Sequence, residues 1–414
     1  PPFAPTAITE TDHASEGGDD GLAGRVQLRW LASPSMTIDI AADASRRRST
    51  QNATHVDAID PRFGILPALD SLIREGRLPG PEITDALASD DWLTSYAGGS
   101  NSIAQNVEGL SATVTKNFGG HNFKLIAARR QLRSHVATDL DGTWFAILQG
   151  DFSERHRQSS AELQASGIFG RLTYTAGLFA LGDWTRTRSL RGAGRIDVLY
   201  LCGCFYLPSA RPVAFYPRRR LSGSSYAAFA QGSLRLTDRL SATLGGRFSH
   251  ERKRTEAELV QLDPDTLEPT DIVLRTGANR GRWSSFTWRA GFEFQVTPDV
   301  MLYASAAKGF KSGGFNARPV VNLPNLGVNQ FDPETAHTYE AGVRSEWFGR
   351  RLRLNATAFH TNYRDIQLRQ QTFFGGILTT LIENAARARI RGVEVEAAAK
   401  LSRRLTASLA YGHL

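Results

Sequence analysis

Apolar and polar residues alternate one for one through much of the chain. Between Phe286 and Val296 every even position is apolar, and the odd positions hold Thr287, Arg289, Gly291, Glu293 and Gln295. The same pattern runs through 22–33, 240–249, 351–358 and 393–401. A period of two places the two sets of side chains on opposite faces of a β-strand. The pattern therefore predicts many strands, each with one apolar face.

The connections between these segments are of two kinds. Short polar turns join pairs of segments at 237–239, 297–299, 348–350 and 402–404. Long connections cover roughly 49–105, 186–223, 255–283 and 311–336. Alternating short and long links indicate a meander of antiparallel hairpins with all of the long loops at one end.

The strands are too long for an ordinary soluble sheet. We expect about 14 of them, at 22–33, 36–47, 106–118, 121–135, 148–166, 171–185, 224–236, 240–254, 284–296, 300–310, 337–347, 351–371, 379–401 and 405–414. A tilted strand crosses a bilayer in about 9–11 residues, whereas soluble strands average about five or six. One apolar face, one polar face and unequal loops indicate an all-β fold, an antiparallel transmembrane β-barrel. A soluble sandwich or propeller is the alternative, and it would have shorter strands.

Three motifs add a family resemblance. They are Tyr303-Ala-Ser-Ala-Ala-Lys-Gly-Phe-Lys-Ser-Gly-Gly-Phe-Asn316, Phe331-Asp-Pro-Glu-Thr-Ala-His-Thr-Tyr-Glu-Ala-Gly342 and Asn384-Ala-Ala-Arg-Ala-Arg-Ile-Arg-Gly-Val-Glu394. In this order they resemble segments of the TonB-dependent outer-membrane receptors, and the resemblance covers about 22–414. It implies a barrel of about 22 strands closed by a plug, of which this sequence holds an incomplete part.

The resemblance sets the expected domains, place and partners. Residues 1–21 are expected to be the remnant of an outer loop, and 22–414 a partial barrel in the bacterial outer membrane. The plug, through which the TonB complex would act, and the last strands are expected to lie outside the sequence. Expected partners are a ferric siderophore or similar solute, TonB, and outer-membrane lipid and lipopolysaccharide. The barrel is expected to be monomeric.

Basic residues suggest where an anionic solute could bind. The chain has 49 Lys and Arg against 41 Asp and Glu. Three clusters, at 46–48, 218–220 and 252–254, fall near the predicted outer ends of strands. Arg218, Arg219 and Arg220, with Arg247 and Arg289 in the lumen, are candidate ligand-binding residues, because a cleft of one charge sign raises capture rates. Contact with lipopolysaccharide phosphates or solvated charge is the alternative interpretation.

The first motif supplies the other candidates. Lys308, Phe310, Lys311, Phe315 and Asn316 begin a predicted outer loop, where they could contact the ligand. The alternative, which we favour, is that they shape the end of the strand together with nearby glycines. Four aromatic residues are expected to be lipid-facing or interfacial anchors: Trp30, Trp288, Tyr303 and Trp347.

Other chemistry finds little support. Ser305 and Lys308 imitate an S-x-x-K pair, but residues three apart on a strand point to opposite faces, so no enzyme is predicted. Cys202 and Cys204 lack a histidine at zinc spacing, and a local disulfide or free thiols are expected instead. No metal or cofactor is expected. Nucleic acid is not expected either, since the positive charge is spread along the chain and not gathered in one patch.

The expected function is energy-coupled import of a scarce, bulky solute, most simply a ferric siderophore. Cobalamin, a glycan or another organic solute remains open within the same class. A passive porin is the alternative from another class, although porins typically have about 16–18 strands.

Overall fold

The described part of the chain is almost entirely β-sheet. The structure, a computed structural model, describes residues 18–50, 74–75, 101–139, 149–192, 215–262, 269–316, 328–374 and 377–414. Its strands are β1 (Asp19–Ser33), β2 (Met36–Thr50), β3 (Ser102–Phe118), β4 (His121–Asp139), β5 (Gln149–Phe169), β6 (Leu172–Gly192), β7 (Phe215–Arg235), β8 (Leu240–Leu262), β9 (Pro269–Thr297), β10 (Val300–Lys311), β11 (Gly314–Phe315), β12 (Gln330–Phe331), β13 (Glu334–Trp347), β14 (Leu352–Phe374), β15 (Ile377–Lys400) and β16 (Thr406–His413). Among these residues, no helix is long and apolar enough to cross a membrane.

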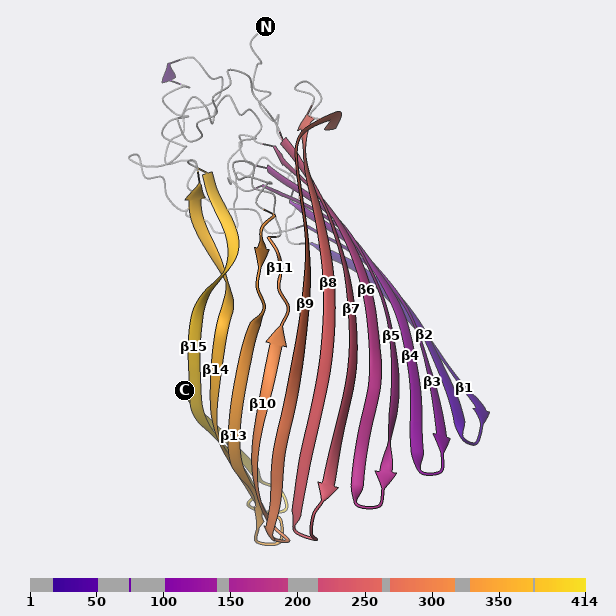
Figure 1. The fold of residues 1–414 in the computed structure, drawn as a ribbon, viewed down its shortest axis with the longest axis vertical. Helices are drawn as coiled ribbons and strands as arrows, with labels where there is room; N and C mark the ends of the chain where they lie inside the picture. Colours follow the sequence, from indigo (N-terminus) through magenta and orange to yellow (C-terminus); the bar gives the residue numbers. More distant parts are fainter. Residues whose placement is uncertain are drawn as a thin grey trace.

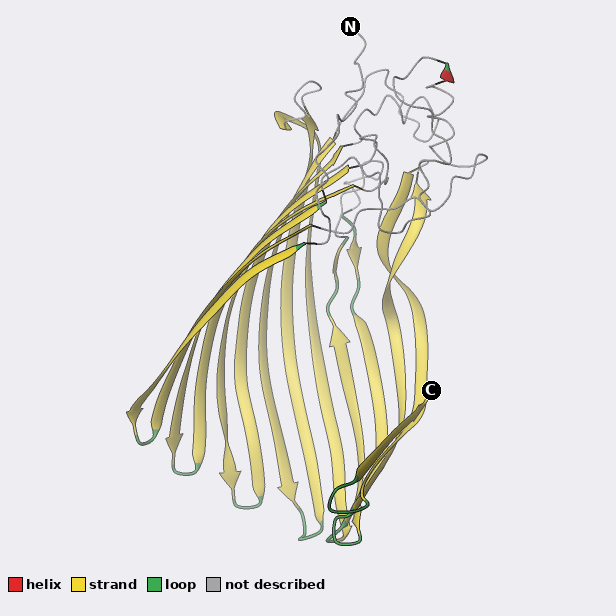
Figure 2. Ribbon diagram, turned by 180° about the vertical axis from the view of Figure 1, so that it is seen from behind, coloured by secondary structure: helices red, strands yellow, loops and turns green. Residues whose placement is uncertain are grey.

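Fourteen strands form one antiparallel sheet in chain order, with β13 following β10. The predicted meander is therefore confirmed. The sheet curves into an open wall, with short turns at one end (Figures 1 and 2). Strands β11 and β12 form a separate pair above the end of β10 (Figure 1).

Several strands continue into segments that were predicted to be loops. Asp19, Asp20 and Gly21 begin β1, although 1–21 was expected to be loop. Strands β8 and β9 run through most of the predicted connection 255–283. The one-sided apolar pattern ends where a strand leaves the bilayer, but the main-chain hydrogen bonds of the ladder do not depend on that pattern. Hydrophobic alternation thus underestimates strand length outside the membrane.

The outer face of the wall is apolar and uncovered. Leu244 is 69% exposed, Phe286 54% and Phe292 56%. A soluble protein would pack such a row into a core, and in water each exposed Å² of apolar surface costs about 25 cal/mol. A hydrocarbon environment removes this cost and agrees with the predicted outward position of the even-numbered residues from Phe286 to Val296.

One predicted anchor lies on the other face. Tyr303 is opposite Glu293 and Gly342 in the register, on the inner face of the wall. Its hydroxyl donates to Glu340 Oε1 at 2.5 Å and lies 2.9 Å from Thr357 Oγ1. The expectation of a lipid-facing Tyr303 is wrong, because its polar partners all lie inside.

Candidate functional site

The strand register separates each basic cluster into outward and inward residues. The two outer members of each cluster share the face of the apolar residues, whereas the middle residue points inward. The middle residues are Arg47, Arg219 and Lys253. Arg218 and Arg220 therefore lie outside the lumen, and only Arg219 of that predicted trio faces it. The lumen therefore receives less positive charge from this trio than the sequence analysis predicted.

Each inward middle residue has a polar partner. Arg47 Nε donates to Asp19 Oδ1 at 2.9 Å, and Arg219 Nε donates to Thr255 Oγ1 at 3.0 Å. Arg219 is 9% exposed, on the part of β7 above the apolar band. Burial lowers the pKa of its guanidinium to about 10, which still leaves the group charged at neutral pH.

Arg247 is the best-positioned cation on the inner face. Its guanidinium carbon lies 5.3 Å from the centre of the Phe179 ring and 5.7 Å from that of Phe229. Its Nε donates to Ser249 Oγ at 3.0 Å. Two aromatic rings and a hydroxyl group restrict the position of the side chain. The fold therefore also sets the direction of the remaining guanidinium nitrogen atoms. The sequence analysis missed Phe179 and Phe229, although both occupy the inward phase of their strands.

Four other predicted site residues, three from the expected loop and one from the lumen, lie at three kinds of position. Lys308 and Phe310 lie in β10 opposite His337 and Thr335, on the outward face, and not in a loop. Lys311 points inward, 61% exposed at its side chain, with Nζ 3.7 Å from Glu334 Oε1. Arg289 lies on the inner face opposite Gly245. The prediction counted Lys308 and Phe310 with the outer loop although they fall in its own predicted strand 300–310, because it did not follow the alternating phase to the end of that strand.

Phe315 and Asn316 belong to a buried bridge between two long hairpins. We call residues 312–316 and 328–334 the bridge. On its first side, Lys253 Nζ donates to Gly313 O at 2.8 Å and to Ser312 Oγ at 3.1 Å. The Phe315 and Trp283 ring centres are 5.9 Å apart, and both side chains are buried. The bridge is thereby attached to β8 and β9.

The second side of the bridge is attached to β14 and β15. Asn384 Nδ2 donates to Asp332 O at 2.8 Å, and the Asp332 amide donates to Asn384 Oδ1 at 2.6 Å. Gln367, directly opposite Asn384 in the ladder, donates from Nε2 to Ser312 O at 2.9 Å. The amide of Ile382 donates to Asn316 Oδ1 at 2.6 Å. The side chain of Asn316 therefore has its hydrogen-bond partner within the protein.

The three sequence motifs thus meet in one structural unit. The first contributes Ser312, Gly313 and Asn316, the second Asp332, and the third Asn384. Of the two interpretations of the first motif, these contacts support strand-end architecture for Phe315 and Asn316. Cys202 and Cys204 lie outside the described residues. Within the described part of the chain, no group of three or more His, Cys, Asp or Glu residues could hold a metal ion.

Comparison with known proteins agrees with this fold. The family described as "TonB dependent receptor-like, beta-barrel" matches residues 41–414. The chain belongs to the TonB-dependent receptors. Its place is therefore the outer membrane, and the predicted fold and family are confirmed.

Curated relatives include other receptors of this kind. This receptor chain is 28% identical over 179 residues to the pesticin receptor of Yersinia pestis, covering 42% of the chain and 24% of the relative. It is 26% identical over 215 residues to the metal-pseudopaline receptor CntO of Pseudomonas aeruginosa, covering 50% of the chain and 28% of the relative. The chain matches only about a quarter of the length of these relatives.

Solved structures share the architecture. The ferric yersiniabactin uptake receptor FyuA from Yersinia pestis superposes with a TM-score of 0.67 at 20% identity, over 96% of this chain and 52% of FyuA. The copper transporter OprC gives a TM-score of 0.60 at 13% identity, over 95% of this chain and 53% of OprC. At these identities the likeness shows the fold alone.

Proposed function

We propose that the intact protein containing this receptor chain imports an anionic metal chelate, most simply a ferric siderophore, by TonB-coupled transport. The carrying observation is the inward cation Arg247, held by Phe179 and Phe229 on the inner face. Exposed Arg289 and Lys311 add positive charge on the same face. Several related receptors bear names that specify ferric or metal-chelate uptake, which supports the same ligand class.

The chemistry required is binding and release. A bulky chelate that is scarce outside the cell needs tight capture, and a charged concave face concentrates an oppositely charged solute. An arginine above aromatic rings can contact both the charged and the apolar parts of a chelate. The work of release would come from TonB acting on a plug. We also propose that the barrel is monomeric, with lipid covering its apolar outer face.

The test is uptake of radiolabelled ferric chelates of differing net charge by iron-limited cells. We expect saturable uptake of at least one anionic chelate, abolished by deletion of TonB. The double variant Arg247→Gln/Arg289→Gln should weaken its binding about tenfold or more, from loss of charge-assisted hydrogen bonds. The control Arg403→Gln/Arg404→Gln removes equal charge at a short turn and should bind normally.

Other outcomes would reject the proposal. Uptake that is unsaturable and independent of TonB would favour the passive porin. Saturable TonB-dependent uptake of cobalamin, a glycan or another organic solute, with no chelate taken up, would retain the transport mechanism and reject the ligand class.

A further inference from the structure

The outward members of the basic clusters form rows on the membrane-facing side of the wall. On β8 and β9, Arg252 is directly opposite Arg282, and Arg254 is directly opposite Arg280. All four side chains are exposed. Like charges facing each other across a ladder destabilise the pair, so these rows favour an anion between them.

Neighbouring acids do not neutralise these rows equally. On β7, Arg220 is opposite Glu256 and Arg218 is opposite Glu258, so those arginines have carboxylates beside them. Glu256 Oε1 also lies 2.6 Å from Arg254 Nη2. Among the described residues, this is the only carboxylate paired with the four arginines of β8 and β9. The four arginines of β8 and β9 therefore carry more positive charge than their paired carboxylate can neutralise. Arg186 and Arg188 of β6, opposite Arg220 and Arg218, extend the basic surface to the neighbouring strand.

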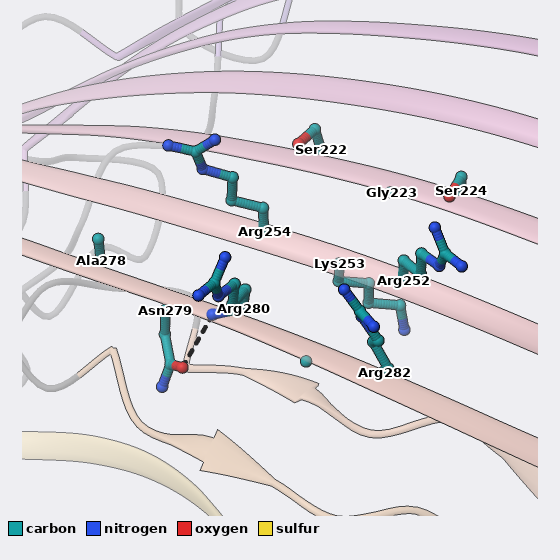
Figure 3. A pocket seen from close by; sticks show the side chains of 11 residues that line it. Ser222, Gly223, Ser224, Arg252, Lys253, Arg254, Ala278, Asn279, Arg280 and Arg282 are labelled. Atoms are coloured by element: carbon teal, nitrogen blue, oxygen red, sulfur yellow. Dashed lines mark hydrogen bonds between the residues drawn. The ribbon is translucent and has the colours of Figure 1, made fainter.

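The same residues line a pocket of about 1040 Å³. Ser222 and Ser224 of β7 form its other edge and add hydroxyl groups. Figure 3 shows the guanidinium groups of Arg252, Arg254, Arg280 and Arg282 projecting from two adjacent strands around this space. Arginine and serine donors in this arrangement suit phosphate, which accepts two parallel bonds from one guanidinium.

An apolar groove begins directly below the pocket. The row after Ser224 and Arg252 pairs Tyr226 with His250, and the following row pairs Ala228 with Phe248. These residues, with Leu125, Leu163 and Leu178, line a second hollow of about 500 Å³. Its surface is almost wholly apolar, and the leucines and Phe248 are exposed. A positively charged, anion-binding pocket above an acyl-sized groove matches an anionic membrane lipid in polarity.

We propose that β7, β8 and β9 bind a phosphorylated glycolipid of the outer leaflet, lipopolysaccharide, at a defined site. Its phosphate groups lie between Arg252, Arg282, Arg254 and Arg280, and its acyl chains lie along the groove beside Phe248. The predicted lipopolysaccharide contact thereby acquires a location. The inference rests on the outer-membrane placement of the chain and not on the identity of the transported solute.

The test uses the intact purified receptor in mild detergent, delipidated and titrated with bisphosphorylated lipid A by native mass spectrometry. We expect the double variant Arg252→Gln/Arg282→Gln to weaken binding about tenfold or more, since each lost bond is charge-assisted. The matched control Arg235→Gln/Arg239→Gln removes the same charge at the other end of β7 and β8, and should bind as wild type does.

Two further ligands separate the possible sources of the phosphate. Dephosphorylated lipid A should bind weakly to both wild type and the arginine variant. Inorganic phosphate alone should bind far more weakly than the lipid, and Phe248→Ala should weaken only lipid binding. Equal lipid binding by wild type and Arg252→Gln/Arg282→Gln would overturn the site. Phosphate binding as tight as that of the lipid would replace it with a simple anion site.

Discussion

The side chain of Asn384 binds both main-chain polar groups of Asp332. Asn384 Nδ2 donates to Asp332 O at 2.8 Å, and Asn384 Oδ1 accepts from the Asp332 amide at 2.6 Å. The same Nδ2 donates to Asp365 O at 2.8 Å, where β14 has a positive φ of 56° and an irregular register. One side chain thus fixes both the bridge and a bulge in the neighbouring strand.

Replacing this side chain should release the bridge from β15. We expect Asn384→Ala to lower the free energy of unfolding by about 1–3 kcal/mol, because several main-chain groups lose their partner. Asn384→Asp keeps an acceptor for the Asp332 amide but loses both donated bonds, so its effect should be intermediate. Thermal denaturation of the detergent-solubilised barrel measures both. A melting temperature unchanged in Asn384→Ala would contradict the proposed fixing role.

Gly313 should tolerate no side chain. A Cβ atom there would collide with Trp283 Nε1 and Phe331 O. We expect Gly313→Ala to cost about 1–3 kcal/mol by overpacking and to shift Trp283 fluorescence towards the red as the ring becomes exposed. Gly309→Ala is the control, because its Cβ would lie 3.9 Å from the nearest atoms of Ala336. Similar spectra for the two variants would argue against close packing at Gly313.

Lys253 should limit opening of the bridge on the other side. Lys253→Met removes the donor to Ser312 and Gly313, bonds of the charged kind that each contribute about 1.5–3 kcal/mol. Amide hydrogen exchange across 312–316 should accelerate about tenfold or more. Arg252→Met, one residue away on the outward face, should leave this exchange unchanged. If both variants accelerate it equally, a general destabilisation of β8 is the better explanation.

The membrane-facing side can be tested with two positions on β8. Leu244 lies on the outward face, where a charge within the bilayer costs about 2–4 kcal/mol near the midplane. Leu244→Arg should therefore reduce the fraction of heat-modifiable, folded receptor in the outer membrane. Ser241 lies inward, opposite Glu293, so Ser241→Arg gains an acidic neighbour and should insert normally. Equal loss for both would mean that the faces are assigned incorrectly.

The sequence predicted the strands because membrane and lumen impose different chemistry on alternate residues. The same alternation also assigns Tyr303 and Lys308 to faces of their strand. Tyr303 falls between apolar Leu302 and Ala304, and so lies in the inward phase. Lys308 falls in the outward phase. Following the phase to the end of β10 would have placed both residues correctly.

The bridge could not be assembled from sequence patterns. Its motifs were visible as short strings, but their partners are main-chain atoms such as Gly313 O and Asp332 O. Any residue type can supply such an atom, so no pattern identifies it. The aromatic support of Arg247 was missed for a related reason. Phe179 and Phe229 meet it across two neighbouring strands, and only the register brings them together.

The bonding of the bridge to main-chain atoms also affects how such a protein can diversify. Lys253, Gln367 and Asn384 donate to the main-chain oxygens of Gly313, Ser312 and Asp332, and these bonds do not depend on the side chains at the exposed bridge positions. Exposed bridge positions such as Asn329 and Gln330 can therefore change by mutation without a matching change in the wall. The path of the bridge and the side chains that it presents at the barrel rim are thus set separately, and its exposed positions are the natural place to graft a new specificity.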